Sequence, residues 1–125
     1  MSDPILGAMR AAASGMEAQG HRLRHTAENL SNADTPGYRR KLAVFRPDEE
    51  GVRVARTQLD QSPGELVFDP HHPLADENGT VLMSNVDPLI ELADSREASR
   101  SYDANLQALT QARRLYDGLL GILKR

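Results

Sequence analysis

The chain has 125 residues, enough for one domain, but only 39% of them are hydrophobic and the aromatic residues, 4% of the total, include no tryptophan. A mean hydropathy of -0.53 leaves little material for a thick core. The absence of cysteine excludes disulfides, thiolate metal sites and cysteine nucleophiles. A formal net charge of -3 gives no general reason to expect nucleic acid as a partner. We expect an elongated molecule with a thin core, stabilised further by other chains.

The first residues, Met1 to Pro4, lack the basic residues and the apolar run of a cleavable secretory signal. No later segment approaches the roughly 18 apolar residues that a membrane-spanning helix needs. We therefore expect either a cytosolic protein or one that is exported by a route reading a different signal.

The N-terminal third predicts one long helix. Asp3 is a suitable N-cap, and Pro4 suits the first helical position. Apolar or small residues then recur at alternating spacings of three and four, which is a heptad seam, until about Ser31. This N-terminal seam consists of Leu6, Met9, Ala13, Met16, Gly20, Leu23, Ala27 and Leu30. At 1.5 Å per residue the helix would be about 40 Å long.

The C-terminal third predicts a second helix of about 35 residues, which begins at another cap and proline pair, Asp87 and Pro88. Its seam consists of Tyr102, Leu106, Leu109, Tyr116, Leu120 and Leu123. The pattern is interrupted where Arg113 takes the heptad position, with Ala112 beside it as an alternative. Because the first seam is slim and the second bulky, we expect the two helices to pack closely as a coiled-coil-like hairpin.

The segment between the helices has a strand-like residue pattern in place of the helical one. Four short runs resemble strands and are divided by proline and glycine, namely residues 42–45, 52–54, 66–68 and 81–83. Asn78 and Gly79 form a tight-turn dipeptide before the last run. The predicted fold is mainly α, with paired terminal helices at 1–34 and 86–125 and a small β-rich or irregular insert at 35–85.

Charge is also segregated along the chain. Lys and Arg are absent between Arg56 and Arg96. That gap contains Asp60, Glu65, Asp69, Asp76, Glu77, Asp87, Glu91 and Asp94, and a basic group precedes it, namely Arg39, Arg40, Lys41, Arg46, Arg53 and Arg56. These charges form either a solvated surface or complementary faces that meet between neighbouring subunits.

The residues that follow the first helix predict a defined turn at the exit from the helix. Pro36 disfavours a helical conformation at Thr35, and the Pro36-Gly37 pair suits the centre of a type II turn. Asn and Ser side chains nearby can bond the freed backbone groups.

The exit string resembles the N-terminal signature of bacterial flagellar rod and hook axial proteins, Asn-x-x-Thr-Pro-Gly-Tyr. The residues that carry it are Asn29, Asn32, Thr35, Pro36, Gly37 and Tyr38. The likeness continues in the insert, in a motif made of Asp69, Pro70, His72, Pro73 and Asp76, and then at residues 84–87 and 101–105. The order of these motifs, and a length without large inserted domains, favour a proximal rod subunit.

This resemblance implies a structural subunit of the basal-body rod, with no catalytic residues and no cofactor. Such subunits polymerise into the shaft that crosses the periplasm, with their terminal helices lining an inner tube and the insert facing outward. The implied partners are copies of the chain, other proximal and distal rod proteins, the rod-base adaptor and the MS-ring region. Export would use the flagellar type III apparatus without a cleaved signal.

Other interpretations explain less of the sequence. A sister proximal rod protein shares the N-terminal signature, and a cytosolic coiled-coil adaptor would account for the heptads alone. A metal-dependent enzyme would depend on His71 and His72, which are adjacent and lack a spaced third ligand. Residues 39–41 form too short a basic cluster for nucleic acid. Ser14 and Ser99 lack a nucleophile-elbow context.

Overall fold

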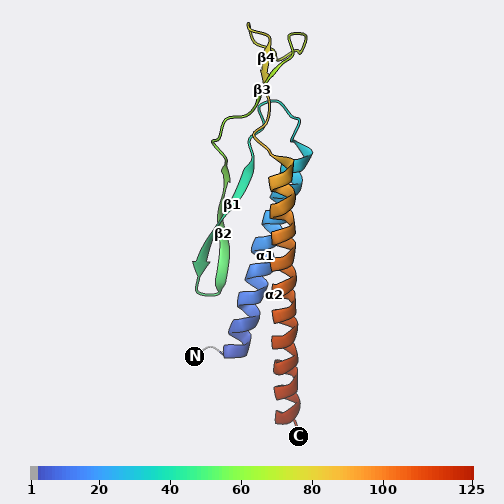
Figure 1. The fold of residues 1–125 in the computed structure, drawn as a ribbon. Coiled ribbons are helices and arrows are strands. Elements are labelled where there is room, and N and C mark those ends of the chain that lie inside the picture. Colours follow the sequence, from blue (N-terminus) through green and yellow to red (C-terminus); the bar gives the residue numbers. More distant parts are fainter. Residues whose placement is uncertain (1–2) are drawn as a thin grey trace.

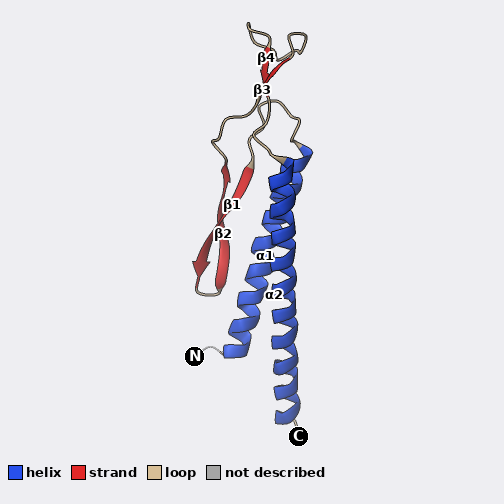
Figure 2. Cartoon of the chain, in the orientation of Figure 1, coloured by secondary structure: helices blue, strands red, loops and turns tan. Residues whose placement is uncertain are grey.

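The computed structural model describes residues 3–125 and contains two long antiparallel helices joined by two small antiparallel sheets (Figures 1 and 2). The elements, in chain order, are α1 (Pro4–Ser31), β1 (Lys41–Asp48), β2 (Gly51–Leu59), β3 (Leu66–Phe68), β4 (Thr80–Leu82) and α2 (Pro88–Leu123). The predicted mainly α fold with a β-rich insert is confirmed. All four strand-like runs form strands, and the first two are longer than expected. β1 continues through Pro47, and β2 pairs with it from end to end.

Both helices begin where the cap and proline pairs predict. The Asp3 carboxylate accepts a hydrogen bond of 2.8 Å from the Ile5 amide. The Asp87 carboxylate accepts one of 3.0 Å from the Leu89 amide. Each bond satisfies a backbone donor that the first helical turn leaves free, and each proline occupies a position that needs no amide.

The two helices pack through small residues. Ala12, Gly15 and Ala18 of α1 are buried, as are Ala98 and Ala112 of α2. A Cβ atom at Gly15 would lie 2.6 Å from Nδ2 of Asn105. Such side chains let the helix backbones approach closely, but they bury little apolar area, so this interface contributes modestly to stability.

The face of α1 that is buried differs from the predicted seam by about one residue. Ala13, Ala27 and Leu30 of that seam are exposed, whereas the residue preceding each of them is buried. Within the single chain, these three residues of the N-terminal seam therefore do not contribute to the contact with the second helix. One residue corresponds to a rotation of about 100° around the helix axis, so a seam that is displaced by one residue faces the side of the hairpin.

The seam of α2 divides in the same way. Tyr102, Leu109 and Tyr116 are half-buried, but Leu106 and Leu123 are exposed. At the interrupted position the alternative residue, Ala112, is the buried one, while Arg113 is exposed. The helices are paired, but only part of the bulky seam contributes to the pairing.

The longer hairpin lies along α1, and the shorter one stands at the end of the molecule (Figure 1). At the turn into β2, Gly51 has a φ of 136°, and a Cβ there would lie 2.4 Å from Oγ of Ser14. That hydroxyl accepts a hydrogen bond of 3.1 Å from the Val52 amide. Glycine therefore allows the hairpin to approach α1. A bulge follows where Val44 pairs with Arg56 and Phe45 with Val54.

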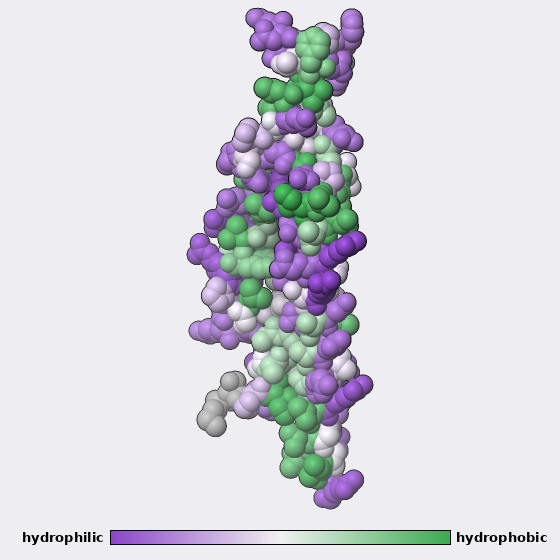
Figure 3. All heavy atoms as spheres, viewed as in Figure 1, coloured by the Kyte–Doolittle hydropathy of each residue, from purple (hydrophilic) through white to green (hydrophobic). Residues whose placement is uncertain are grey.

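The end of α2 extends beyond α1. If the pairing of Gly15 with Asn105 is continued along the antiparallel helices, the start of α1 lies near Tyr116, and the last two turns of α2 have no helix beside them (Figure 1). These turns carry exposed apolar side chains, which form the apolar surface at the lower end of Figure 3. The exposed large residues there are Leu119, Leu120, Ile122 and Leu123. Neither helix of the described chain is long and apolar enough to cross a membrane.

The close approach of the helices predicts that Ala98, whose exposed fraction is 0%, tolerates no larger side chain. We expect Ala98→Leu to lower the free energy of unfolding by about 1–3 kcal/mol, because extra methylenes would force the helices apart. Urea unfolding followed by circular dichroism measures this change. Ala104→Leu, at an exposed position of the same helix, is the matched control and should change stability by less than about 0.5 kcal/mol. Equal effects would contradict the packing described.

Candidate functional site

The exit from α1 is a hydrogen-bonded turn, as the sequence predicts. The Tyr38 amide donates to the Thr35 carbonyl at 3.2 Å, and Gly37 has a φ of 75°, which is the positive value required at the third position of a type II turn. The Thr35 hydroxyl donates to the Asn32 side chain at 3.1 Å. The Gly37 amide donates to the Leu82 carbonyl at 3.0 Å, so the turn is attached to the strand that leads towards α2.

Asn29, in the last turns of α1, is buried with an exposed fraction of 1% and uses all four of its hydrogen-bonding sites. Its Oδ1 accepts from the Tyr38 hydroxyl at 2.8 Å and from the Lys41 amide at 2.9 Å. Its Nδ2 donates to the Lys41 carbonyl at 3.0 Å and to Oε2 of Glu91 at 3.2 Å. One side chain thus joins α1, the exit turn, β1 and α2. Burial, with the nearby Glu28 carboxylate, raises the pKa of Tyr38.

Glu91 is a fully buried acidic residue near the start of α2, and its partner is Arg40. Nε of Arg40 donates to Oε1 of Glu91, and Nη2 of Arg40 donates to Asp94. Burial of Arg40 acts to lower its pKa, but the hydrogen bond that Arg40 donates to Glu91, together with the neighbouring carboxylates, outweighs this effect, so the pKa is raised. A buried carboxylate without such a partner would cost several kcal/mol. We call Asn29, Tyr38, Arg40, Asn85 and Glu91 the elbow network.

Asn85 completes the elbow network from the opposite side. Its Oδ1 accepts from the Arg40 amide at 2.6 Å, and its Nδ2 donates to the carbonyls of Asp60 and Ser62 at 3.0 Å each. The neighbouring Ser84 hydroxyl donates to the Ala33 carbonyl just after α1. The elbow network therefore attaches the returning chain to both the exit turn and the end of β2.

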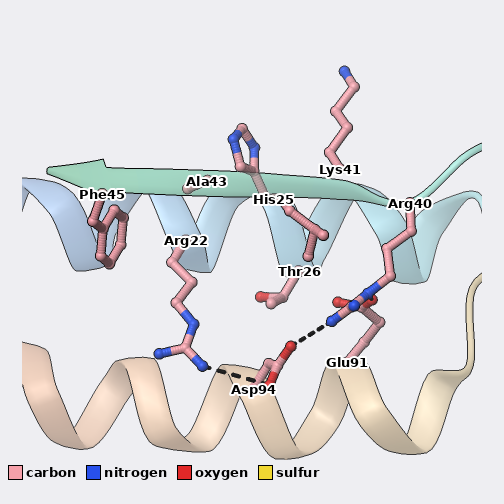
Figure 4. Close-up of a pocket in the computed structure, with 10 residues that line it drawn as sticks. Arg22, His25, Thr26, Arg40, Lys41, Ala43, Phe45, Glu91 and Asp94 are labelled. Carbon is pink, nitrogen blue, oxygen red and sulfur yellow. Dashed lines mark hydrogen bonds and ion pairs between the residues drawn. The ribbon is translucent and has the colours of Figure 1, made fainter. Parts of the chain in front are cut away.

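A second arginine extends this ionic arrangement along the helix pair. Figure 4 shows Arg22 of α1 and Arg40 approaching Asp94 of α2 from two sides. Nη2 of Arg22 lies 3.4 Å from Oδ1 of Asp94 and 3.1 Å from Oε2 of Glu97. Arg22, Arg40 and Asp94 line a cleft of about 340 Å³ between the helices and β1. Because the charged groups pair with one another, the cleft is best explained as part of the scaffold.

The insert motif shapes a loop at the end of the molecule. The Asp76 carboxylate accepts from the Thr80 amide at 2.9 Å, from its hydroxyl at 2.8 Å and from the Asn78 amide at 2.9 Å. These bonds, those from Thr80 above all, lower the pKa of Asp76. Gly79 has a φ of 75°, which agrees with the predicted Asn78-Gly79 turn.

The histidine of the insert motif also serves the loop. Nδ1 of His72 accepts from the Leu74 amide at 3.0 Å. No three metal-ligating side chains lie close enough to hold an ion within residues 3–125. The insert motif folds a loop far from the exit turn, so the two motifs do not form one site (Figure 1).

Sequence reasoning found part of the elbow network. Asn29 and Tyr38 were predicted as members of the exit motif, whereas Arg40 and Glu91 appeared only as members of opposite charge groups. Asn85 had no assigned role beyond the resemblance of its segment. A carboxylate in the first turn of a helix is usually a favourable exposed charge, so no local signal distinguishes Glu91 as buried.

Comparison with known proteins agrees with this architecture at both ends of the chain. The family model described as flagella basal body rod protein matches residues 9–39, which contain most of α1 and the exit turn. The model described as flagellar basal body rod FlgEFG protein C-terminal matches residues 77–122, which contain all of α2 but its last residue. Both ends of the chain, which form the paired helices, are therefore similar to flagellar basal-body rod proteins.

Individual relatives narrow this class. The chain is 46% identical to the flagellar basal-body rod protein FlgC of Agrobacterium fabrum, over 98% of this chain and 97% of the relative. It is 41% identical to FlgC of Salmonella typhimurium over 84% of this chain and 87% of the relative. It is 35% identical to FlgC of Aquifex aeolicus over 90% of this chain and 92% of the relative. The chain belongs to the FlgC family of flagellar basal-body rod proteins. It is a structural subunit of the rod in the flagellar basal body, where it assembles with other rod proteins.

The buried ion pair predicts a large and non-additive effect of mutation. We expect Arg40→Leu to lower the free energy of unfolding by about 3–5 kcal/mol, because Glu91 would remain buried without its counter-charge. The double variant with Glu91→Leu should recover much of this loss. Arg39→Leu, at the exposed neighbouring position, should have an effect of under about 0.5 kcal/mol. Urea unfolding of the wild type, Arg40→Leu, Glu91→Leu and the double variant tests the cycle, with Arg39→Leu measured beside them, and additive losses would contradict a paired role.

His25 predicts a pH dependence of the contact between α1 and β2. Burial lowers the pKa of His25 below its ordinary value of 6.5, and its Nε2 shares a hydrogen bond of 3.0 Å with the Thr57 hydroxyl. Its contribution to stability is complete above pH 6.5 and is lost as the pH falls through the lowered pKa, because the unfolded chain binds the proton more readily. Urea unfolding at pH 7.5 and 5.5 should show this loss in the wild type and a smaller loss in His25→Gln. An NMR titration of the His25 ring at or above 6.5 would contradict it.

Proposed function

We propose that the chain polymerises with itself and with proximal and distal rod proteins into the periplasm-spanning shaft that transmits torque. In this assembly the terminal segments 1–34 and 86–125 pack as coiled coils around the export channel and form part of its wall. The insert, residues 35–85, faces outward. The rod-base adaptor and the MS-ring region are the neighbours at the base, and the flagellar type III apparatus exports the chain without a cleaved signal.

The observation that supports this proposal is the incomplete core of the single chain. The helix pair buries mainly alanine and glycine, whereas large apolar residues along α2 stay exposed, among them Leu106, Leu115, Ile122 and Leu123. Contiguous exposed apolar surface of this kind is typical of protein interfaces. The exposed part of the N-terminal seam, Ala13, Ala27 and Leu30, adds a second surface for neighbouring helices.

Torque transmission needs stiffness, not chemistry. A helical array repeats each weak contact many times, and head-to-tail interfaces that do not close generate open filaments. The elbow network supports this role, because it holds both helices and the insert as one unit when load is applied. The family is one of structural proteins, and the proposal assigns no catalytic residue.

The exposed α2 surface predicts a separation of export from assembly. We expect Leu106→Glu to reduce incorporation of the chain into purified basal bodies at least tenfold and to abolish swimming, because a carboxylate would be buried at a subunit interface. Secreted levels of the chain should stay within about twofold of wild type. Gln107→Glu, beside it on an exposed position, is the matched control. Normal swimming of a strain that carries only Leu106→Glu would contradict the proposed interface.

A further inference from the structure

The shorter hairpin, β3–β4, stands alone at one end of the molecule (Figure 1). Within residues 3–125 its strands pair with each other, the exit turn is bonded to it through the Gly37 amide and the Leu82 carbonyl, and it packs against neither helix nor the longer hairpin. Leu66 and Phe68 are exposed by 66% and 72%, on the face opposite the buried Val81. A two-stranded hairpin of this size is marginally stable by itself in water. Its exposed apolar face is therefore a candidate for contact with another surface.

This hairpin also carries unbalanced negative charge. Glu65, Asp69 and Glu77 are exposed, and none of them forms an ion pair among the described residues. Lys and Arg are absent from residues 57–95. We call Glu65, β3, β4 and the loop between the two strands, residues 65–82 in all, the tip. The tip thus combines exposed apolar side chains with carboxylates.

The strands of the longer hairpin carry exposed arginines, whereas its turn is acidic, with Asp48, Glu49 and Glu50. Arg46 and Arg53 lie directly across from each other in the β1–β2 register, and Arg56 lies across from Val44. All three arginines are exposed, and in the part of the chain that the structure describes no carboxylate lies within 4.0 Å of their guanidinium groups. Like charges directly opposite in an antiparallel pair destabilise it. An anionic partner on this surface, which we call the arginine face, would remove that cost.

We propose that the tip of one copy of the chain docks on the arginine face of a second copy. Carboxylates of the tip would pair with the arginines, and Phe68 would lie against a guanidinium group in a cation–π contact. The two surfaces lie at different heights of the molecule and so cannot meet within one chain (Figure 1). The contact is heterologous and leaves a free tip and a free arginine face after each addition. This inference rests on the proposed function, since it names one contact of the polymer.

A second copy fits both surfaces better than another anionic partner does. A phospholipid headgroup or a nucleic acid could neutralise the arginine face, but it would leave the tip with its exposed Phe68 and carboxylates unaccompanied. The tip supplies carboxylates and an exposed aromatic ring, and the arginine face supplies the cations that both can bind. Complementary charge also favours the correct register, because a tip placed against another tip would bring carboxylates together.

Cysteine cross-linking in assembled basal bodies tests the contact directly, because the chain has no native cysteine. The probe pair is Asn78→Cys at the tip and Gln58→Cys on the arginine face, where the Gln58 side chain accepts a hydrogen bond of 3.3 Å from Arg56. A strain that expresses both variants should yield, after mild oxidation, a disulfide that joins residues 78 and 58 of two copies. The control pair, Asn78→Cys with Gln107→Cys on α2, should give none.

Charge reversal tests the physical basis of the contact. Arg46→Glu with Arg53→Glu should reduce the 78–58 cross-link more than tenfold, because the tip would meet like charge. Adding Glu65→Arg and Glu77→Arg to the same chain should restore it, which a variant that merely failed to fold could not do. Arg10→Glu with Arg24→Glu, at exposed positions of α1, is the control for a change of net charge and should leave the cross-link unchanged.

The outcomes separate this contact from the proposed function. If the wild-type chain is absent from purified basal bodies, the proposed function itself fails. If the chain is present but no 78–58 cross-link forms, or residue 78 links to a different protein, the contact between copies is wrong while the polymer stands. A cross-link that does not respond to charge reversal would likewise overturn the docking proposed here.

Discussion

The buried carboxylate of Glu91 is the constraint on which the rest of the structure depends. A charge with no exposure must be paired, and its partners, Arg40 and Asn29, belong to two other segments of the chain. Only one alignment of α1, the exit turn and α2 brings these groups together. The elbow network therefore sets the relative position of the helices at one end. Along the rest of the pair, the contact between small residues keeps the two backbones close together.

The thin interface between the helices connects stability with assembly. Because Ala12, Ala18 and Ala98 fill the contact, the helices come close together while many large apolar residues of α2 remain exposed. Those residues stay on the outer surface and on the overhanging end of α2 (Figure 3). A subunit built in this way has a definite shape as a single chain but a complete hydrophobic core only beside neighbours, which suits a component of a polymer.

Charges along the chain serve two different purposes. Arg22 and Arg40 pair with carboxylates of α2 and help hold the hairpin together. The arginines of the β1–β2 surface have no such partners within the described residues. Arg46 and Arg53 lie opposite each other in the register, and this opposition of like charges destabilises the hairpin. Segregation of charge in the sequence thus resolves into an internal set, which stabilises the fold, and a surface set, which is available for contacts between chains.

Local chemistry determined much of this protein from the sequence alone. Asp3 with Pro4 and Asp87 with Pro88 start the helices, Pro36 with Gly37 shapes the exit turn, and alternating runs become strands, because caps, turns and periodicity act between residues close in the chain. Only the tertiary structure decided which face of each helix is buried. The heptad pattern pointed to Ala13 and Ala27, but the buried residues are Ala12 and Thr26. Periodicity specifies the spacing of a stripe, whereas its rotation depends on how closely two backbones can approach and on which charges must be paired, such as Glu91 with Arg40, more than fifty residues apart in the sequence.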